Sequence, residues 1–369
     1  MGKVSGLMLL GFSLSTTAPL VLATLHESVL VTAPMVALTL PVALIIYLYV
    51  KSYWGPEGLY HYASSVSVRL GGVQFYSWLI SYFLYIVYTV DYVDYMVLKV
   101  PDQVANALTL ILPLVLSILV LTGASYAALL ALAIAALLAL AIAQVVLALP
   151  IPQLGWALFL ALPSSVNQGL FVNILSSSLL IVCITLIPYA NGDPRSSRYV
   201  MYVFLVSAIL LVMGSFFKAS TIVNQLTSLS YIGLILAEYV ALYNLLFLGF
   251  RIKPSRFVVP VLVVLLDAVS LINYNEFYDL TIYPSVSALY LTLLVSFAVA
   301  PIYLTRARPG SSIAVKAAYI ALAAVSSLIA AYGAYSVIST SSGVELYESL
   351  AAIVVPIVLG VLKSPSPTR

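Results

Sequence analysis

The stretch GLMLLGFSLSTTAPLVLATL, residues 6–25, holds the features that decide the fold. It is twenty residues long and carries no charged side chain, which is typical of a helix that crosses a lipid bilayer. Its centre contains Gly11, a hydroxyl-rich run at residues 13–17 and then Pro19. Glycine weakens a helix, and proline cannot donate to its hydrogen-bond ladder. The stretch therefore predicts a membrane-spanning helix that is broken near its middle.

Eleven further apolar segments follow the first one. Apolar residues make up 63% of the chain and charged residues 7%, whereas a soluble domain carries roughly 25% charged residues. Lipid leaves unpaired backbone groups unsatisfied, and no segment alternates like a barrel strand, so each span is predicted to be a helix. We therefore expect an all-α, polytopic membrane protein of about twelve transmembrane helices. The further segments cover residues 29–50, 71–98, 104–122, 125–149, 170–191, 198–217, 221–250, 256–273, 282–304, 312–338 and 346–363.

The positions of the basic residues predict an orientation. With the N-terminus inside, only Lys99 and Lys218 of the 15 Lys and Arg residues fall outside. Such a bias predicts a multi-pass protein of the cell membrane with cytoplasmic N- and C-termini. The inside set is Lys3, Lys51, Arg69, Arg195, Arg198, Arg251, Lys253, Arg256, Arg306, Arg308, Lys316, Lys363 and Arg369.

The sixth segment shows interruptions like those of the first. It contains Ser176–Ser178, then Cys183, Thr185 and Pro188. Because five spans separate the two segments, a second five-helix unit enters the membrane from the opposite side. Paired broken helices of this kind are typical of inverted-repeat transporters. We predict a first repeat at residues 1–150, a second at 151–305, and two additional helices with a C-terminal tail at 306–369.

Broken helices at the middle of a membrane expose backbone groups that can bind a carboxylate or a cation. On the first span, the hydroxyls that flank the predicted break are those of Ser13, Ser15, Thr16 and Thr17. The alternative is that these interruptions serve packing alone, since Gly and Pro are common in membrane helices.

Acidic residues inside apolar segments are costly, and they are candidates for function. Glu238 lies near the centre of the eighth span, Asp267 near mid-depth of the ninth, and Asp91 toward the outer end of the third. No Lys or Arg lies at the depth of Glu238 or Asp267, so we predict these three acids as proton-coupling groups. A neutral acid that is hydrogen-bonded within the bundle is the alternative. Asp94 is interpreted as an interface residue.

Tyrosines also mark one face of the third span. Tyr85, Tyr88, Tyr92 and Tyr95 follow a spacing of 3, 4 and 3 residues, which places them on one side of a helix. Tyr88 is a candidate substrate ligand. Helix packing and the interfacial aromatic belt are the alternative roles of this face.

Two stretches resemble the amino acid–polyamine–organocation (APC) permeases. The predicted inner loop reads GPEGLYHY at residues 55–62, followed by LG at 70–71 and Trp78, and the junction after the sixth span reads GDPR at 192–195. The resemblance implies a five-plus-five inverted-repeat bundle with two extra helices, and an amino acid or amine substrate. It also implies a binding site at residues 13–17 of the first span and at Val182, Cys183, Ile184 and Thr185 of the sixth.

The sequence thus predicts a secondary transporter of amino acids or related small organic solutes, working by alternating access with H⁺ or Na⁺ as a possible coupling cation. We predict no cofactor and no nucleic-acid partner. Two alternatives stay open: a non-transporting membrane subunit or assembly factor, and an intramembrane enzyme using Asp91, Asp94 and Asp193. The enzyme is disfavoured because a rise of about 1.5 Å per residue separates Asp91 from Asp193 by roughly 20–30 Å.

Overall fold

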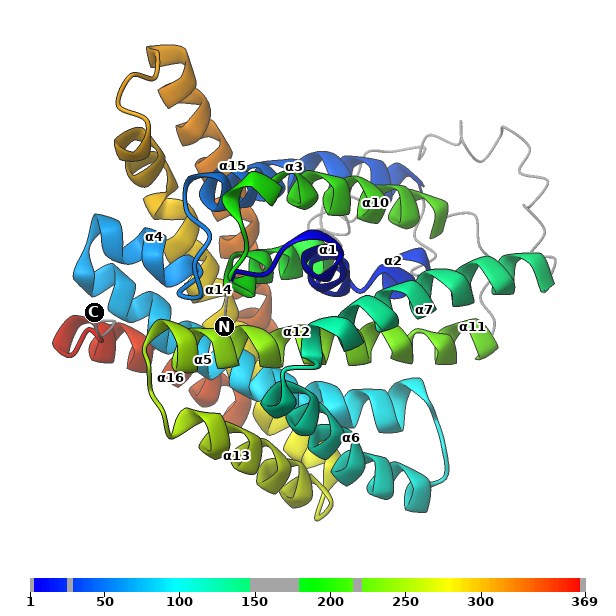
Figure 1. The fold of residues 1–369 in the computed structure, drawn as a ribbon. Coiled ribbons are helices and arrows are strands. Elements are labelled where there is room, and N and C mark those ends of the chain that lie inside the picture. The colour runs from blue at the N-terminus through cyan, green and yellow to red at the C-terminus, as the bar shows by residue number, and fades with distance from the viewer. Residues whose placement is uncertain (1–2, 25–28, 147–178, 215–220, 366–369) are drawn as a thin grey trace.

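The computed structural model describes residues 3–24, 29–146, 179–214 and 221–365 (Figure 1). Within these ranges the chain is helical, apart from turns and one parallel bridge between Val4 and Gly192. The all-α prediction is therefore confirmed. The elements are α1 Gly6–Ser15, α2 Pro19–Ala23, α3 Val29–Ser52, α4 Leu59–Val66, α5 Val68–Asp91, η1 Tyr92–Val97, α6 Asp102–Thr122, α7 Ser125–Val146, η2 Leu179–Ala190, η3 Pro194–Ser196, α10 Arg198–Gly214, α11 Thr221–Leu226, α12 Ser228–Tyr243, η4 Asn244–Gly249, α13 Ser255–Ser270, α14 Tyr274–Ala307, α15 Ile313–Thr340 and α16 Gly343–Leu362.

Each predicted span corresponds to helical structure. In the described part of the chain, nine helices are long and apolar enough to cross a membrane. The remaining three predicted spans correspond to the pair α1 and α2, to η2, and to α13. The first part of the sixth predicted span, with Ser176–Ser178, lies outside the described residues, as does Lys218.

Helix α5 lies at the centre of one side of the bundle, where it packs against α4, α12, α13, α14 and α16 (Figure 1). On the other side, α1 packs against α7, and α10 packs against α2 and α3. Large apolar side chains remain exposed on the outward faces of several helices, for example Ile111 on α6, Phe257 on α13 and Leu328 on α15. A continuous apolar exterior of this kind suits lipid rather than water.

The segments predicted to be cytoplasmic meet at one end of the bundle. The Val4 amide donates to the Asn191 carbonyl (3.0 Å), the Tyr60 hydroxyl to the Pro365 carbonyl (2.6 Å), and Arg306 Nη1 to the Ser65 carbonyl (3.1 Å). Both chain ends also lie on this side in Figure 1. We call it the inner end and the opposite one, which carries Lys99, the outer end. Which end faces the cytoplasm stays a prediction.

Close backbone contact joins α5 to α16. A Cβ atom built on Gly360 would lie 2.2 Å from the Val73 amide nitrogen, and one on Gly72 would lie 2.6 Å from the Gly360 carbonyl oxygen. Small residues are what allow membrane helices to approach this closely.

Substituting leucine for Gly360 is expected to destabilise the protein by about 1–3 kcal/mol, because overpacking forces the two helices apart. The measurement is the midpoint of thermal unfolding in detergent. Gly310→Leu is the matched control, because a Cβ atom at Gly310 meets no atom within 4 Å. Equal midpoints for the two variants would contradict the assignment.

Candidate functional site

The first span is broken, as its sequence predicts. Helix α1 ends at Ser15 and α2 begins at Pro19, and between them Ala18 has a φ of 43°. The hydroxyls of Thr16 and Thr17 donate to the carbonyls of Ser13 (2.7 Å) and Leu14 (3.0 Å). The α2 amide of Leu20 donates to Ser230 Oγ on α12 (3.0 Å). Side-chain hydroxyls thus stabilise both sides of an interruption that proline imposes.

Gly11 does not contribute to this break. It lies inside α1, and a Cβ atom there would lie 2.6 Å from the Cα atom of Leu130 on α7. The expectation that this glycine helps to interrupt the helix was therefore wrong. Its role is to allow the close approach of α1 to α7.

The described part of the sixth span shows no break between two half-helices. Its described part, η2, is a continuous 3₁₀ helix from Leu179 to Ala190 that includes Pro188. The Thr185 hydroxyl donates to the Val182 carbonyl (2.7 Å). A long 3₁₀ stretch has poorer hydrogen-bond geometry than an α-helix and often marks a hinge or a strained segment. The described part of this span is therefore irregular because it forms a 3₁₀ helix, and not because the helix is interrupted.

The two irregular segments face one central cavity of about 260 Å³. The lining includes five predicted site residues: Thr16, Thr17, Tyr88, Val182 and Cys183. Tyrosine hydroxyls, threonine hydroxyls and a thiol here lie beside apolar side chains such as Leu234 and Leu289. A small enclosed space with a few polar groups on apolar walls is typical of a small-molecule site.

Four residues of the predicted substrate-binding set do not line this cavity. Ser15 Oγ donates to the Gly11 carbonyl (3.0 Å) and also lies 3.3 Å from the Leu129 carbonyl, and Thr185 is bonded within η2. Ser13 and Ile184 are fully buried. These side chains support the helices that form the cavity.

Sequence reasoning missed two tyrosines of the cavity wall. Tyr231 comes from α12 and Tyr290 from α14. Their segments carried no local signal beyond an apolar pattern. A Cβ atom on Gly333 would lie 2.3 Å from the Tyr290 ring. Gly333, on α15, therefore leaves room for the Tyr290 ring. This contact is visible only in the folded structure.

Glu238 lies behind the cavity wall. It is fully buried on α12, and both of its carboxyl oxygens are without a hydrogen-bond partner among the described residues. The carboxyl group lies within electrostatic range of Tyr85, Tyr88 and the Cys183 thiol, which all line the cavity. A charged side chain at the centre of a membrane helix costs about 2.5–3.5 kcal/mol or more. A carboxyl so placed has no evident structural role.

Asp91 and Asp267 lie in the same buried region, and neither side chain lines the central cavity. Ser270 Oγ donates to Asp91 Oδ1 (2.8 Å) and also contacts the Asp267 carbonyl (2.8 Å). Asp94 is buried as well, and Thr109 Oγ1 donates to its Oδ2 (3.1 Å). Its place at the membrane interface stays a prediction. Both Asp267 carboxyl oxygens are without a hydrogen-bond partner in the described structure. No group of three His, Cys, Asp or Glu side chains within the described ranges is arranged to hold a metal ion.

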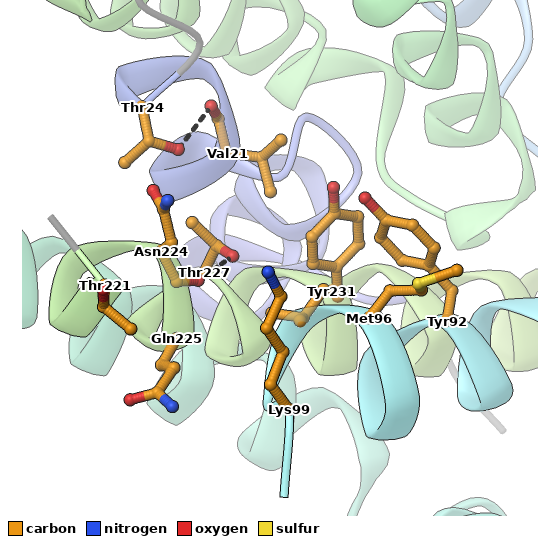
Figure 2. Close-up of a pocket in the computed structure, with 11 residues that line it drawn as sticks. Val21, Thr24, Tyr92, Met96, Lys99, Thr221, Asn224, Gln225, Thr227 and Tyr231 are labelled. Atoms are coloured by element: carbon orange, nitrogen blue, oxygen red, sulfur yellow. Dashed lines mark hydrogen bonds between the residues drawn. The ribbon is translucent and has the colours of Figure 1, made fainter. Parts of the chain in front are cut away.

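A second cavity of about 280 Å³, the outer cavity, is lined by residues that include Thr24, Tyr92, Lys99 and Asn224 (Figure 2). Val21 and Tyr231 line both spaces. The Tyr92 and Tyr231 rings lie edge to face with centroids 5.3 Å apart, and Tyr278 contacts both Tyr88 (5.7 Å) and Tyr92 (6.3 Å). The predicted tyrosine face of the third span therefore forms part of an aromatic partition between the two cavities. Tyr95 lies beyond it, stacked on Tyr274.

The inner end beneath the central cavity is closed by contacts to the last turns of η2. The Trp54 indole donates to the Ile187 carbonyl (3.0 Å), Asn244 Nδ2 to the Tyr189 carbonyl (2.7 Å), and the Tyr126 hydroxyl to the Ala190 carbonyl (2.7 Å). The Trp78 and Tyr189 rings pack with centroids 4.2 Å apart. Contacts among the described residues therefore close the inner end beneath the central cavity.

His61 on α4 belongs to this inner closure. Its ring stacks on Tyr53 at 3.7 Å, and burial lowers the pKa of His61 below its usual 6.5, opposed in part by the Glu57 charge. The unfolded chain therefore binds more protons than the folded one below about pH 6.5, so this group lowers the free energy of unfolding as pH falls.

We expect the unfolding midpoint of the wild type to drop between about pH 7.5 and pH 5.5, and His61→Gln to reduce that drop. Identical pH profiles would contradict the assignment.

Comparison with solved structures places this architecture among membrane transporters. The chain is similar to a mutant of the Eremococcus coleocola manganese transporter, with a TM-score of 0.60 and 14% identity over 98% of this chain and 95% of that one. It is also similar to the same transporter in complex with an aromatic bis-isothiourea substituted compound, with a TM-score of 0.50, 14% identity and the same coverage. No family model and no curated protein sequence matches the chain. The fold is that of a multi-pass membrane transporter.

Proposed function

We propose that this protein is a secondary active transporter of amino acids or related small organic solutes, and that the solute binds in the central cavity. The observation that carries the proposal is the placement of that cavity against the break of the first span and against η2. A cavity at two irregular helices that is closed below, and that shares Val21 and Tyr231 with an outer cavity, suits transport by alternating access.

The chemistry of the wall supports a small organic solute that is partly polar and partly apolar. Thr16, Thr17 and Tyr88 offer hydroxyl groups, while Leu234 and Leu289 offer apolar surface. The resemblance to the APC permeases supports amino acids or amines. The repeat boundaries at residues 1–150 and 151–305, with the added helices at 306–369, remain part of this proposal.

Coupling to protons is the second part of the proposal, with Glu238 as the group that carries the proton. Its carboxyl lies close enough to the cavity for solute and proton to influence one another. Asp91 and Asp267 are further candidates, because both are buried where Asp91 on α5 accepts a hydrogen bond from Ser270 on α13.

Cys183 provides a direct test, because it is the sole cysteine of the chain and lines the central cavity. A bound solute is expected to slow alkylation of this thiol by a maleimide added from the outer side. Amino acids, amines and nucleobases are screened at two pH values, and a Cys183→Ser variant reports background labelling. Protection by one class, followed by its uptake into vesicles, would support the proposal. No protection and no uptake would favour a non-transporting subunit.

Manganese, which the neighbours' descriptions name, is the second candidate. A thiol at the wall with a carboxyl behind it is the observation that favours a divalent cation, because both groups bind such ions. In the same assay, Mn²⁺ would then protect Cys183 where amino acids and amines do not.

A further inference from the structure

We propose that the outer cavity is a binding site for solutes that carry a carboxylate, anchored by Lys99, where the solute binds before it reaches the central cavity. The onward transfer rests on the proposed transport function. Binding of a carboxylate in the outer cavity does not depend on it.

The first argument is charge. Of the described residues that line the outer cavity, Lys99 alone is charged, and no ion pair within the described structure engages its ammonium group. The acids nearest along the chain, Asp94 and Asp102, do not line the space, and Asp94 accepts a hydrogen bond from Thr109 elsewhere. The described lining of the cavity therefore has a net positive charge.

The second argument is the backbone of Lys99. Its φ of 51° lies in the left-handed region, which a residue with a side chain adopts at a cost of about 1–3 kcal/mol. The preceding carbonyl of Leu98 accepts a hydrogen bond from Gln225 Nε2 on α11 (2.9 Å). This arrangement turns the side chain into the cavity, and its ammonium group lies near Thr227 in Figure 2. Glycine would fit this backbone conformation without strain.

The remaining polar groups suit the second half of a carboxylate site. Thr221, Asn224 and Thr227 lie along one side of the outer cavity, and the hydroxyl ends of Tyr92 and Tyr231 lie on the other (Figure 2). The Thr227 hydroxyl already donates to the Asn224 carbonyl (2.5 Å). The Asn224 amide and the Thr221 and tyrosine hydroxyls can bind one carboxylate oxygen while the ammonium group binds the other, and such charge-assisted bonds are the strong ones. The same positive charge disfavours a free divalent cation. The site thus selects anionic or zwitterionic solutes.

Position links this site to the central cavity. Tyr231 and Val21 line both spaces, so a solute held at Lys99 lies across the aromatic partition from Cys183. On this proposal, a reagent that reaches Cys183 through the outer cavity passes Lys99.

The experiment compares two thiosulfonate reagents of similar size and opposite charge that modify Cys183 in the full-length protein. In the wild type the anionic reagent is expected to react faster, on the order of tenfold at low salt, with the preference falling as salt is added. Lys99→Gln should remove the preference, Lys99→Glu should reverse it, and Lys99→Arg should retain it. Lys363→Gln, an exposed lysine at the inner end, is the matched control. An unchanged preference in Lys99→Gln would overturn the proposal.

Acetate and its uncharged analogue acetamide test binding without the thiol. Acetate is expected to raise the unfolding midpoint of the wild type more than acetamide does, and Lys99→Gln should abolish the difference. An equal acetate effect in Lys99→Gln would exclude this site. If the outer cavity discriminates by charge and binds acetate while vesicles take up no solute, the transport proposal fails and this one stands. If uptake proceeds but Lys99→Gln changes neither the charge preference at Cys183 nor the acetate effect, the carboxylate site fails and the transport proposal stands.

Discussion

Replacing Glu238 with glutamine is expected to reduce uptake driven by a proton gradient to the level seen without a gradient, a loss of about tenfold or more, equivalent to at least about 1.4 kcal/mol. Glutamine has nearly the same shape, so the packing of α12 is retained, but it has no proton to exchange in this range of pH. Since neither carboxyl oxygen of Glu238 has a hydrogen-bond partner among the described residues, the substitution breaks no such bond that holds the fold.

The measurement is uptake by purified protein in vesicles, with and without an imposed pH difference, together with solute exchange at equal pH. Exchange should persist in Glu238→Gln if the variant still binds and moves the solute. Asp279→Asn, at an exposed acid on α14, is the matched control. Gradient-driven uptake that is unchanged in Glu238→Gln and lost in Asp267→Asn would move the coupling role to the contact between α5 and α13.

The sequence predicts the spans well, because length and apolar composition are local properties. It also locates the break of the first span, since Pro19 acts on the turn that precedes it. The role of Gly11 was predicted wrongly, because a glycine that weakens a helix and a glycine that permits contact look alike in one sequence. Only the neighbouring Leu130 backbone separates the two readings.

Long-range relations were beyond sequence reasoning. The spacing of Tyr85, Tyr88 and Tyr92 indicates one helix face, but nothing in it identifies Tyr231 and Tyr278 as the partners that complete the aromatic partition. The meeting of Asp91 with Ser270 likewise joins residues 179 positions apart. An apolar run also reads the same whether it winds as an α-helix or as the 3₁₀ helix found for η2.

Truncation of Trp54 to alanine is the substitution expected to change the conformational equilibrium most. The Trp54 side chain is 1% exposed, its indole donates to the Ile187 carbonyl, and its ring fills the space beside Gly192. Removing a buried tryptophan costs about 3–5 kcal/mol. This contact belongs to the closure of the inner end. Its loss is therefore expected to destabilise the closed arrangement relative to one that is open at the inner end.

We therefore expect Cys183 in Trp54→Ala to be labelled less from the outer side and more from the inner side. A shift of 3 kcal/mol corresponds to about a hundredfold change in the ratio of the two states, at about 1.4 kcal/mol per tenfold. Trp54→Phe keeps most of the ring but leaves the Ile187 carbonyl without its donor, so it should shift the ratio less, by about 1–3 kcal/mol.

The control for this experiment separates gating from general loss of stability. Phe297 on α14 is as deeply buried as Trp54 and takes no part in the contacts described at the inner end. Phe297→Ala should therefore lower the unfolding midpoint without changing the side from which Cys183 is labelled. A variant of Trp54 that unfolds more readily but keeps outer-side labelling would show that the indole stabilises the bundle in both states. The closure would then rest on the hydrogen bonds that hold the end of η2, from Asn244 to the Tyr189 carbonyl and from Tyr126 to the Ala190 carbonyl.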